Sequence, residues 1–229
     1  MDPKAWKDRL EGRPLLSDHP IAMRFSLLLW ALGGVLFIVL QVPALKSVMQ
    51  TVDDGIHSLA VHLEFAPVVR IAELLDFLGS AWVTFPLMIG VAAYLGWQKR
   101  WEGLMYWTLS MVLSQVLIGP LKALYERPRP DLALVETSGF SFPSGHAVVG
   151  AAIALSLVVV LVPAGPPRRN LKMAAGAFAV LMGLSRVYLR AHWLSDVVAG
   201  VALGAAVAVG VAAVMHYAAE RASDPEVAD

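Results

Sequence analysis

Long, uninterrupted apolar stretches dominate the sequence and predict its fold. Six of them approach the roughly 20 residues that a helix needs to cross a bilayer. Because their apolar positions are continuous rather than alternating, they favour helices over the strands of a membrane barrel. We predict an all-α, polytopic membrane protein whose residues 1–229 form a single integral-membrane domain, with flexible tails at 1–21 and 222–229. The six predicted transmembrane helices are about Phe25–Val42, Ala81–Trp97, Leu104–Leu121, Ala147–Val162, Met173–Tyr188 and Leu194–Met215.

A periodic pattern lies between the first two predicted spans. Within Ser47–Phe65, apolar residues recur every three or four positions from Val48 to Leu63, which places them on one helical face. Polar residues, including Asp53 and His57, lie off that face. We predict an interfacial amphipathic helix that lies on the outer surface of the membrane.

The composition favours lipid as the solvent and limits the possible chemistry. Hydrophobic residues make up 58% of the chain and charged residues only 16%, against about 25% charged in a typical soluble domain. The net charge of zero gives no reason to expect a nucleic-acid partner. Because the chain has no cysteine, thiolate nucleophiles, disulfides and Cys-ligated metal sites are excluded.

The distribution of basic residues predicts an orientation. Six spans place both termini on one side of the membrane, and that side carries eleven Lys and Arg residues against seven on the other. By the positive-inside tendency, we expect both termini to be cytoplasmic. Most of the seven charges on the outer face fall within two short segments. Such clustering calls for a functional reason.

The first charged segment, Lys122–Pro130, follows the third predicted span. Prolines after Arg127 and Arg129 push both arginines toward extended backbone. An arginine fork matches phosphate oxygens and a lysine supplies a point charge, so the segment fits a phosphate site. Taken alone, it fits a basic patch for anionic lipid headgroups equally well.

The second segment, Phe142–His146, stands where the fourth predicted span begins. Ser144 is a good N-cap candidate, and Gly145 lets a ligand approach the free N–H groups of the helix start, which attract anions. His146 then stands on the first turn and faces any bound anion. The alternative is a capped helix with an interfacial histidine.

The third segment, Ser185–Asp196, pairs a histidine with a carboxylate. His192 and Asp196 are four residues apart, which stacks them on one face of a helix. The carboxylate can accept the proton of one imidazole nitrogen and leave the other free to attack. Arg186 offers a further phosphate fork. The alternative is a hydrogen-bonded pair that stabilises a helix end.

Together the three segments fit phosphoryl transfer, which needs charge stabilisation on three oxygens, an in-line nucleophile and an acid for the leaving oxygen. They read Lys-x6-Arg-Pro, Pro-Ser-Gly-His and Ser-Arg-x5-His-x3-Asp. This order resembles the three signature motifs of the type 2 phosphatidic acid phosphatase superfamily. The six-span layout resembles its bacterial membrane branch of lipid phosphatases.

The resemblance implies a role for each motif residue. His192 would form a phosphohistidine, Asp196 would orient it, and His146 would protonate the leaving oxygen. No metal and no cofactor would be needed for hydrolysis. The phosphoryl oxygens would be held by Lys122, Arg129, Ser144, Gly145 and Arg186.

The expected function is therefore that of a lipid phosphatase in a bacterial inner or plasma membrane, acting at the outer leaflet. Substrates implied by the resemblance include undecaprenyl diphosphate, phosphatidylglycerophosphate and phosphatidate. One alternative is a phosphotransferase that passes the phosphoryl group from His192 to another acceptor. The other is a lipid transporter or binding protein that has kept the phosphate cradle without catalysis.

Several residues outside the motifs carry smaller expectations. Arg127 either meets a second phosphate or headgroup or is a solvated loop charge, and the second interpretation is preferred. Asp76 is expected at the membrane interface. Gly200 and Gly204 form a small-xxx-small face suited to tight helix packing. The remaining histidines, expected at the surface and without metal-ligand spacing, are His19, His57, His62 and His216.

Overall fold

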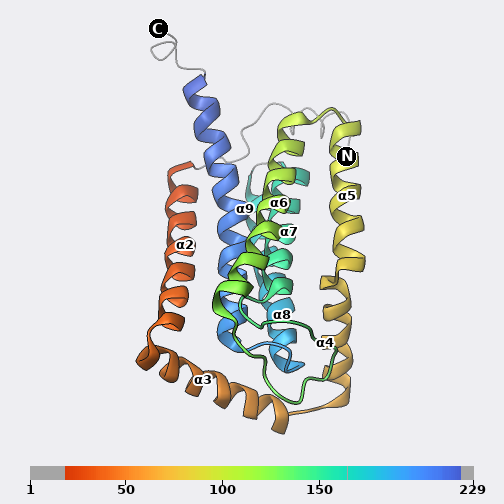
Figure 1. Ribbon diagram of the computed structural model, residues 1–229. Helices are drawn as coiled ribbons and strands as arrows, with labels where there is room; N and C mark the ends of the chain where they lie inside the picture. Colours follow the sequence, from red (N-terminus) through yellow and green to blue (C-terminus); the bar gives the residue numbers. More distant parts are fainter. Residues whose placement is uncertain (1–18, 164, 223–229) are drawn as a thin grey trace.

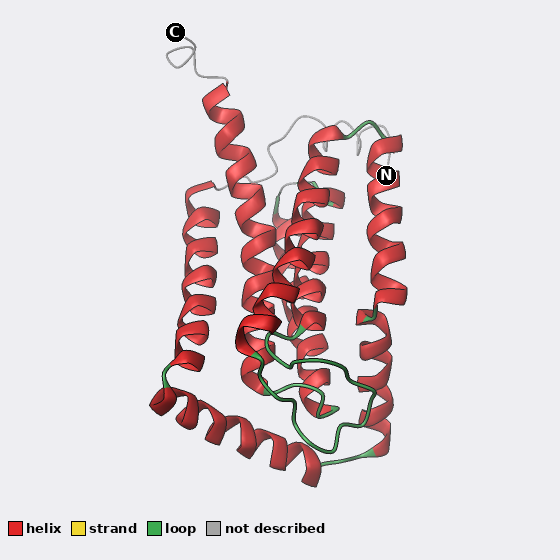
Figure 2. Cartoon of the chain, in the orientation of Figure 1, coloured by secondary structure: helices red, strands yellow, loops and turns green. Residues whose placement is uncertain are grey.

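The computed structural model describes residues 19–163 and 165–222, and every regular element within those residues is a helix (Figures 1 and 2). The predicted all-α fold is thus confirmed for this part of the chain. Residues 19–21 and 222, predicted as tail, belong to helices, and the rest of both predicted tails lies outside the described residues. The helices are α2 (His19–Gln41), α3 (Pro43–His62), α4 (Ala66–Gly79), α5 (Ala81–Trp97), α6 (Trp101–Tyr125), α7 (Gly145–Leu161), α8 (Pro166–Tyr188) and α9 (Leu194–Ala222).

The long helices run side by side as a bundle, and α3 crosses one end of it (Figure 1). The loop between α6 and α7 lies at the same end, whereas α2 begins and α9 ends at the opposite end. The ends of α6 and α8 and the starts of α7 and α9, which carry the three motifs, therefore gather beside α3. This agrees with the predicted placement of the motifs on one face, while the side of the membrane that they face stays a prediction.

Within the described part of the chain, fewer helices than the six predicted are long and apolar enough, by length and composition alone, to cross a membrane. Among the described helices, α6, α8 and α9 are each long and apolar enough to cross a bilayer. Two bent pairs, α2 with α3 at 106° and α4 with α5 at 46°, raise the count to five if each pair is one span. Helix α7 is apolar but has only 17 residues. Each predicted stretch holds a helix, and six crossings remain a prediction.

Small residues allow α7 and α9 to pack unusually close together. A Cβ atom built at Gly200 would lie 2.8 Å from the Ser144 carbonyl oxygen, and one at Gly204 would lie 2.1 Å from the Val148 carbonyl oxygen. Both distances are below 3.0 Å, which real Cβ atoms essentially never show. The tight packing predicted for this glycine pair is confirmed, and it brings the start of α7 against the first turns of α9.

Helix α3 confirms the predicted amphipathic helix, and its polar side packs against the rest of the protein. Its apolar residues Val48 and Val52 are 65% and 56% exposed, so one face points away from the bundle. The side that carries Asp53 and Ala60 is buried against the protein. Asp53 lies off the apolar face, as predicted, yet it faces the interior rather than water. That α3 lies on a membrane stays a prediction.

Candidate active site

The catalytic histidine predicted from the third motif is buried beside its carboxylate. His192 is 3% exposed and Asp196 is fully buried, and His192 Nδ1 lies 3.4 Å from Asp196 Oδ2. The two residues do not share a helix as expected, because α9 begins only at Leu194. Asp196 instead stands in the first turn of α9 and reaches back, accepting a hydrogen bond of 3.0 Å from the Trp193 N–H. Asp196 thus binds the backbone N–H that precedes the helix, as the acidic residue of a capping box does, and the same oxygen orients the imidazole.

The protonation of His192 follows from its surroundings. Burial lowers the pKa of His192 to about 4, because it outweighs the opposing hydrogen bond and charge of Asp196. The imidazole is therefore neutral near pH 7. With Nδ1 donating to Asp196, the lone pair falls on Nε2, which lies 3.2 Å from Arg129 Nη1. A neutral nucleophile thus faces a fixed cation.

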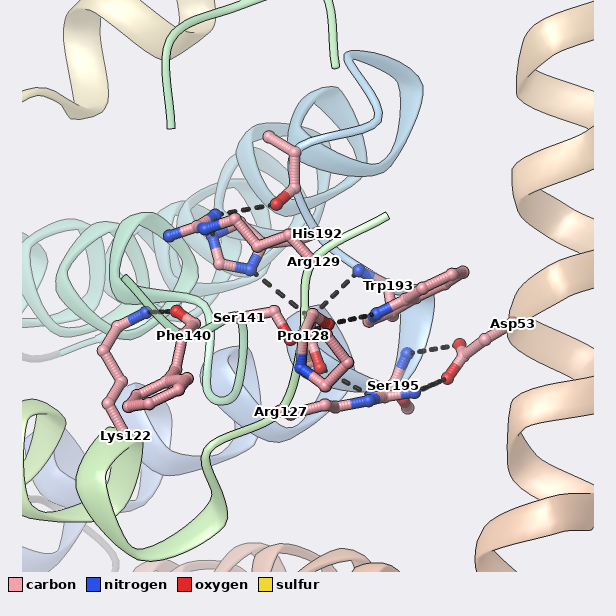
Figure 3. A network of polar contacts seen from close by, with 12 residues as sticks. Asp53, Lys122, Arg127, Pro128, Arg129, Phe140, Ser141, His192, Trp193 and Ser195 are labelled. Carbon is pink, nitrogen blue, oxygen red and sulfur yellow. Dashed lines mark hydrogen bonds and ion pairs between the residues drawn. The ribbon is translucent and has the colours of Figure 1, made fainter. Parts of the chain in front are cut away.

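Figure 3 shows Arg129 beside His192, and three backbone carbonyls accept hydrogen bonds from its guanidinium. Its Nε donates to the Gly139 oxygen at 3.0 Å, its Nη1 to the Ala191 oxygen at 2.7 Å and its Nη2 to the Ser138 oxygen at 2.8 Å. Lys122, in the last turn of α6, donates to the Phe140 oxygen of the same loop. The loop between α6 and α7 therefore binds two cations of the first motif, and Arg129 is the one that contacts His192.

The second motif begins α7 as predicted, with one difference. Ser144 is the N-cap residue, with extended backbone, but its hydroxyl makes no capping bond. The hydroxyl is buried and finds no partner among the described residues. A Cβ atom built at Gly145 would lie no closer than 3.8 Å to Ile118, so the helix start is uncrowded. A free hydroxyl and free N–H groups can accept an anionic ligand here.

His146 and Arg186 meet at the carboxylate of Asp76, which was not predicted from the sequence to belong to the site. His146 Nε2 lies 3.2 Å from Asp76 Oδ1, and Arg186 Nη1 forms an ion pair with the same oxygen. Asp76, predicted merely at the interface, reaches in from α4 and stays 24% exposed. Helix α4 fits closely against His146, because a Cβ atom at Gly79 would lie 2.5 Å from the imidazole Cδ2. The Asp76 carboxylate thus lies between two residues predicted to handle phosphate.

Arg127 is not the solvated loop charge that was preferred from the sequence. It is 3% exposed and forms ion pairs with Asp196 Oδ1 at 2.6 Å and with Asp53 Oδ2 at 2.7 Å. Its guanidinium also stands over the Trp193 ring, 5.5 Å from the centroid. The expectation was wrong because both carboxylates lie far along the chain, where loop composition gives no sign of them. The fork of Arg127 is filled by protein carboxylates.

Two further contacts fix the corner between α3 and α4 to the segment that carries His192. The Tyr188 hydroxyl donates to the Leu63 oxygen and accepts from the Phe65 N–H, each at 2.9 Å. Arg190 forms an ion pair of 2.9 Å with Glu64. Neither contact could be read from the sequence, since the partners are more than 120 positions apart.

An apolar groove of about 380 Å³ runs beside the site, between α3, α4 and α8. Its walls include Leu59, Ile71, Leu75 and Leu184. Leu75 and Ser185 are the sequence neighbours of Asp76 and Arg186. The groove therefore lies next to the helix positions that carry the two polar side chains.

Comparison with known proteins gives consistent matches. A family model described as the PAP2 superfamily matches residues 103–220. Phosphatidylglycerophosphatase B of Bacillus subtilis (strain 168) is 33% identical over 174 residues, which cover 73% of this chain and 85% of the relative. Lipid A 1-phosphatase of Rhizobium johnstonii is 31% identical over 166 residues, covering 61% and 65%. The crystal structure of a transmembrane PAP2 type phosphatidylglycerolphosphate phosphatase from Bacillus subtilis superposes with a TM-score of 0.73 at 29% identity, over 89% of this chain and 99% of that one.

Proposed function

We propose a phosphohistidine mechanism for this protein, which belongs to the PAP2 superfamily and is a membrane lipid phosphatase. One observation carries the proposal. His192 is buried, with a carboxylate at Nδ1 and a guanidinium 3.2 Å from Nε2. A phosphoryl group bound by Arg129 would replace the contact between Arg129 Nη1 and Nε2 and present its phosphorus to the Nε2 lone pair.

In the first step, His192 Nε2 attacks phosphorus and forms a P–N bond, while the bond from phosphorus to the lipid oxygen breaks. In the empty site, burial and the charges of Arg129 and Lys122 lower the pKa of His146 to about 4, so His146 takes up its proton only when the negative charge of the bound phosphate offsets them. His146 then gives this proton to the lipid oxygen, and the lipid alcohol leaves. The positive charge on His192 is stabilised by Asp196. The charge on the equatorial oxygens is stabilised by Arg129, Arg186 and Lys122 and by Ser144 and the N–H groups from Gly145 onward.

In the second step, water attacks the phosphorus of the phosphohistidine. His146, now neutral, takes a proton from the water as the P–N bond breaks, which returns His146 to its starting form. Inorganic phosphate leaves and His192 is neutral again. Asp76 must release Arg186 before a phosphate can bind there, since its carboxylate occupies the guanidinium in the empty site.

We propose that the substrate is a phosphate monoester of a lipid, with phosphatidylglycerophosphate the first candidate because of the Bacillus subtilis relative. The hydrocarbon chain would lie in the apolar groove between α3, α4 and α8 while the phosphate reaches His192. The site would face the outer side of a bacterial membrane, with both termini cytoplasmic. No metal ion takes part in either step.

The test is phosphate release by the purified protein in detergent from a panel of lipids. The panel comprises phosphatidylglycerophosphate, phosphatidate, undecaprenyl diphosphate and lipid A 1-phosphate. We expect turnover of at least one lipid and complete loss in the His192→Ala protein. Full activity of His192→Ala would overturn the mechanism. Transfer of phosphate to an added alcohol instead of water would identify a phosphotransferase, and binding without turnover of any lipid would identify a binding protein.

A further inference from the structure

A buried network joins the interfacial helix α3 to the reacting histidine. Figure 3 shows Asp53 on α3 pointing toward Ser195 and Arg127, on the side opposite to Lys122. Asp53 is 2% exposed, Arg127 3% and Asp196 0%. Three charges are thus fully removed from water, which is costly unless each one is paired with good geometry. The mechanism above uses only Asp196 of the three.

Arg127 divides the two oxygens of Asp196 between separate tasks. Its Nη1 binds Oδ1 at 2.6 Å, which leaves Oδ2 for His192 Nδ1 and the Trp193 N–H. The bond from His192 is 3.4 Å long, near the limit at which a hydrogen bond still counts. A small rotation of the Asp196 carboxylate would break it, and Arg127 is the group that opposes this rotation.

Asp53 holds both Arg127 and the start of α9. Its Oδ2 accepts from Arg127 Nη2 at 2.7 Å, and its Oδ1 accepts from the Ser195 N–H at 3.0 Å. The Ser195 hydroxyl donates to Oδ2 at 2.5 Å. A carboxylate at a helix start satisfies a free N–H and is favoured by the helix dipole. Asp53 therefore caps, from another helix, the turn that carries Asp196.

We propose that Asp53 and Arg127 are positioning residues for the Asp196–His192 pair, so that α3 is part of the catalytic apparatus. The inference rests on the proposed function, since it assumes attack by His192. Among the described residues, neither side chain has a contact with the proposed phosphate-binding residues Lys122, Arg129, Ser144, Gly145 and Arg186. Besides each other, the two side chains contact Gln50, Trp193, Ser195 and Asp196. Their loss should therefore slow the attack without weakening the binding of the substrate.

Asp53→Asn is the primary variant, because asparagine keeps the shape of the side chain and removes its charge. We expect kcat to fall about 10- to 100-fold, the loss that a displaced reacting group causes, with KM within about twofold. Asp54→Asn is the matched control. It makes the same change one position along α3, where the side chain is exposed and bonds only Gln50 at 2.8 Å among the contacts described, and we expect it to leave kcat unchanged.

Arg127→Lys and Arg127→Gln extend the series. Lysine keeps the charge but not the fork that spans two carboxylates, so its kcat should lie between those of the wild type and Arg127→Gln. Arg127→Gln leaves two buried carboxylates facing each other and risks misfolding. The double variant Asp53→Asn/Arg127→Gln removes the Asp53 carboxylate and the Arg127 guanidinium together. It should melt closer to the wild type than Arg127→Gln does, while its kcat stays low.

The deciding readout is the rate of phosphohistidine formation in a single turnover, quenched in alkali because the P–N bond is labile in acid. A slowed rate with normal KM in Asp53→Asn supports positioning. Recovery of both melting temperature and kcat in the double variant would show a purely structural role and overturn the inference. So would wild-type kcat in Asp53→Asn when His192→Ala is inactive. Full activity of His192→Ala would overturn the proposed function itself.

Discussion

Replacing Gly204 with alanine tests whether the close packing of α7 on α9 sets the geometry of the site. The new Cβ atom would lie 2.1 Å from the Val148 carbonyl oxygen and 3.0 Å from the Ala151 Cβ. Contacts between non-bonded atoms normally relax to about 3.5 Å, so the two helices must separate by roughly 1.4 Å. Backbone on both sides leaves no flexible side chain to give way. Overpacking of this kind costs about 1–3 kcal/mol.

The same shift should reach the catalytic groups. Helix α7 carries His146, two residues before Val148, and α9 carries Asp196, two turns before Gly204. A misplacement of about 1 Å can cost on the order of 100-fold in rate, so kcat should fall by one to two orders of magnitude. The assays are thermal melting in detergent and phosphate release. Gly176→Ala on α8 is the control, since its Cβ meets nothing within 4 Å. Helix propensity should make that variant as stable as the wild type or slightly more stable. A Gly204→Ala protein that melts and turns over like Gly176→Ala would refute the reasoning.

Three further predictions concern the charges of the site. Asp76→Asn removes a carboxylate that competes with phosphate for Arg186. Because a partly exposed ion pair is worth up to about 1 kcal/mol, the variant should bind inorganic phosphate as an inhibitor roughly fivefold more tightly. An unchanged inhibition constant would contradict the competition. Burial lowers the pKa of His192 to about 4, below its value of about 6.5 in the unfolded chain. As the pH falls, the imidazole is therefore protonated in the unfolded chain before it is protonated in the folded protein. The contribution of His192 to stability, about 3 kcal/mol at most, should be complete above pH 6.5 and be lost as the pH falls toward 4. The wild type should therefore lose more melting temperature over this range than His192→Asn, and parallel curves would count against a neutral buried imidazole. Finally, EDTA should leave the activity unchanged; a loss restored by Mg²⁺ would indicate a metal enzyme.

The sequence was sufficient to predict that the motif residues gather at one end of the bundle, because each one belongs to a short, ordered pattern at a helix end. Ser144 at the start of α7 shows this, since its capping position follows from local rules alone. The placement of His192 and Asp196 on one helix was wrong in detail. Asp196 caps the start of α9 and reaches back, and that geometry depends on where the helix begins rather than on spacing.

The residues that the sequence missed share one physical property: their partners are distant along the chain. Arg127 lies 74 positions from Asp53, and Asp76 lies 70 positions from His146. Periodicity shows that Asp53 leaves the apolar face of α3, but not whether that side meets water or protein. Only the way α3 crosses the bundle end decides this. The count of spans depends on the bends at the α2–α3 and α4–α5 junctions, whose angles of 106° and 46° do not follow from the length and composition of the apolar stretches.

The two sides of α3 together have a consequence for which lipids the enzyme can use. One side exposes Val48, Val52, Leu59 and Leu63, and the other is fixed by buried ion pairs to the turn that holds Asp196. Seated on a membrane as predicted, α3 would set the height of His192 above the hydrocarbon boundary as a constant of the protein. The enzyme would then select substrates by the distance between the phosphate and the hydrocarbon boundary of the membrane. The size of the lipid headgroup sets that distance, and the identity of the hydrocarbon chain would matter less.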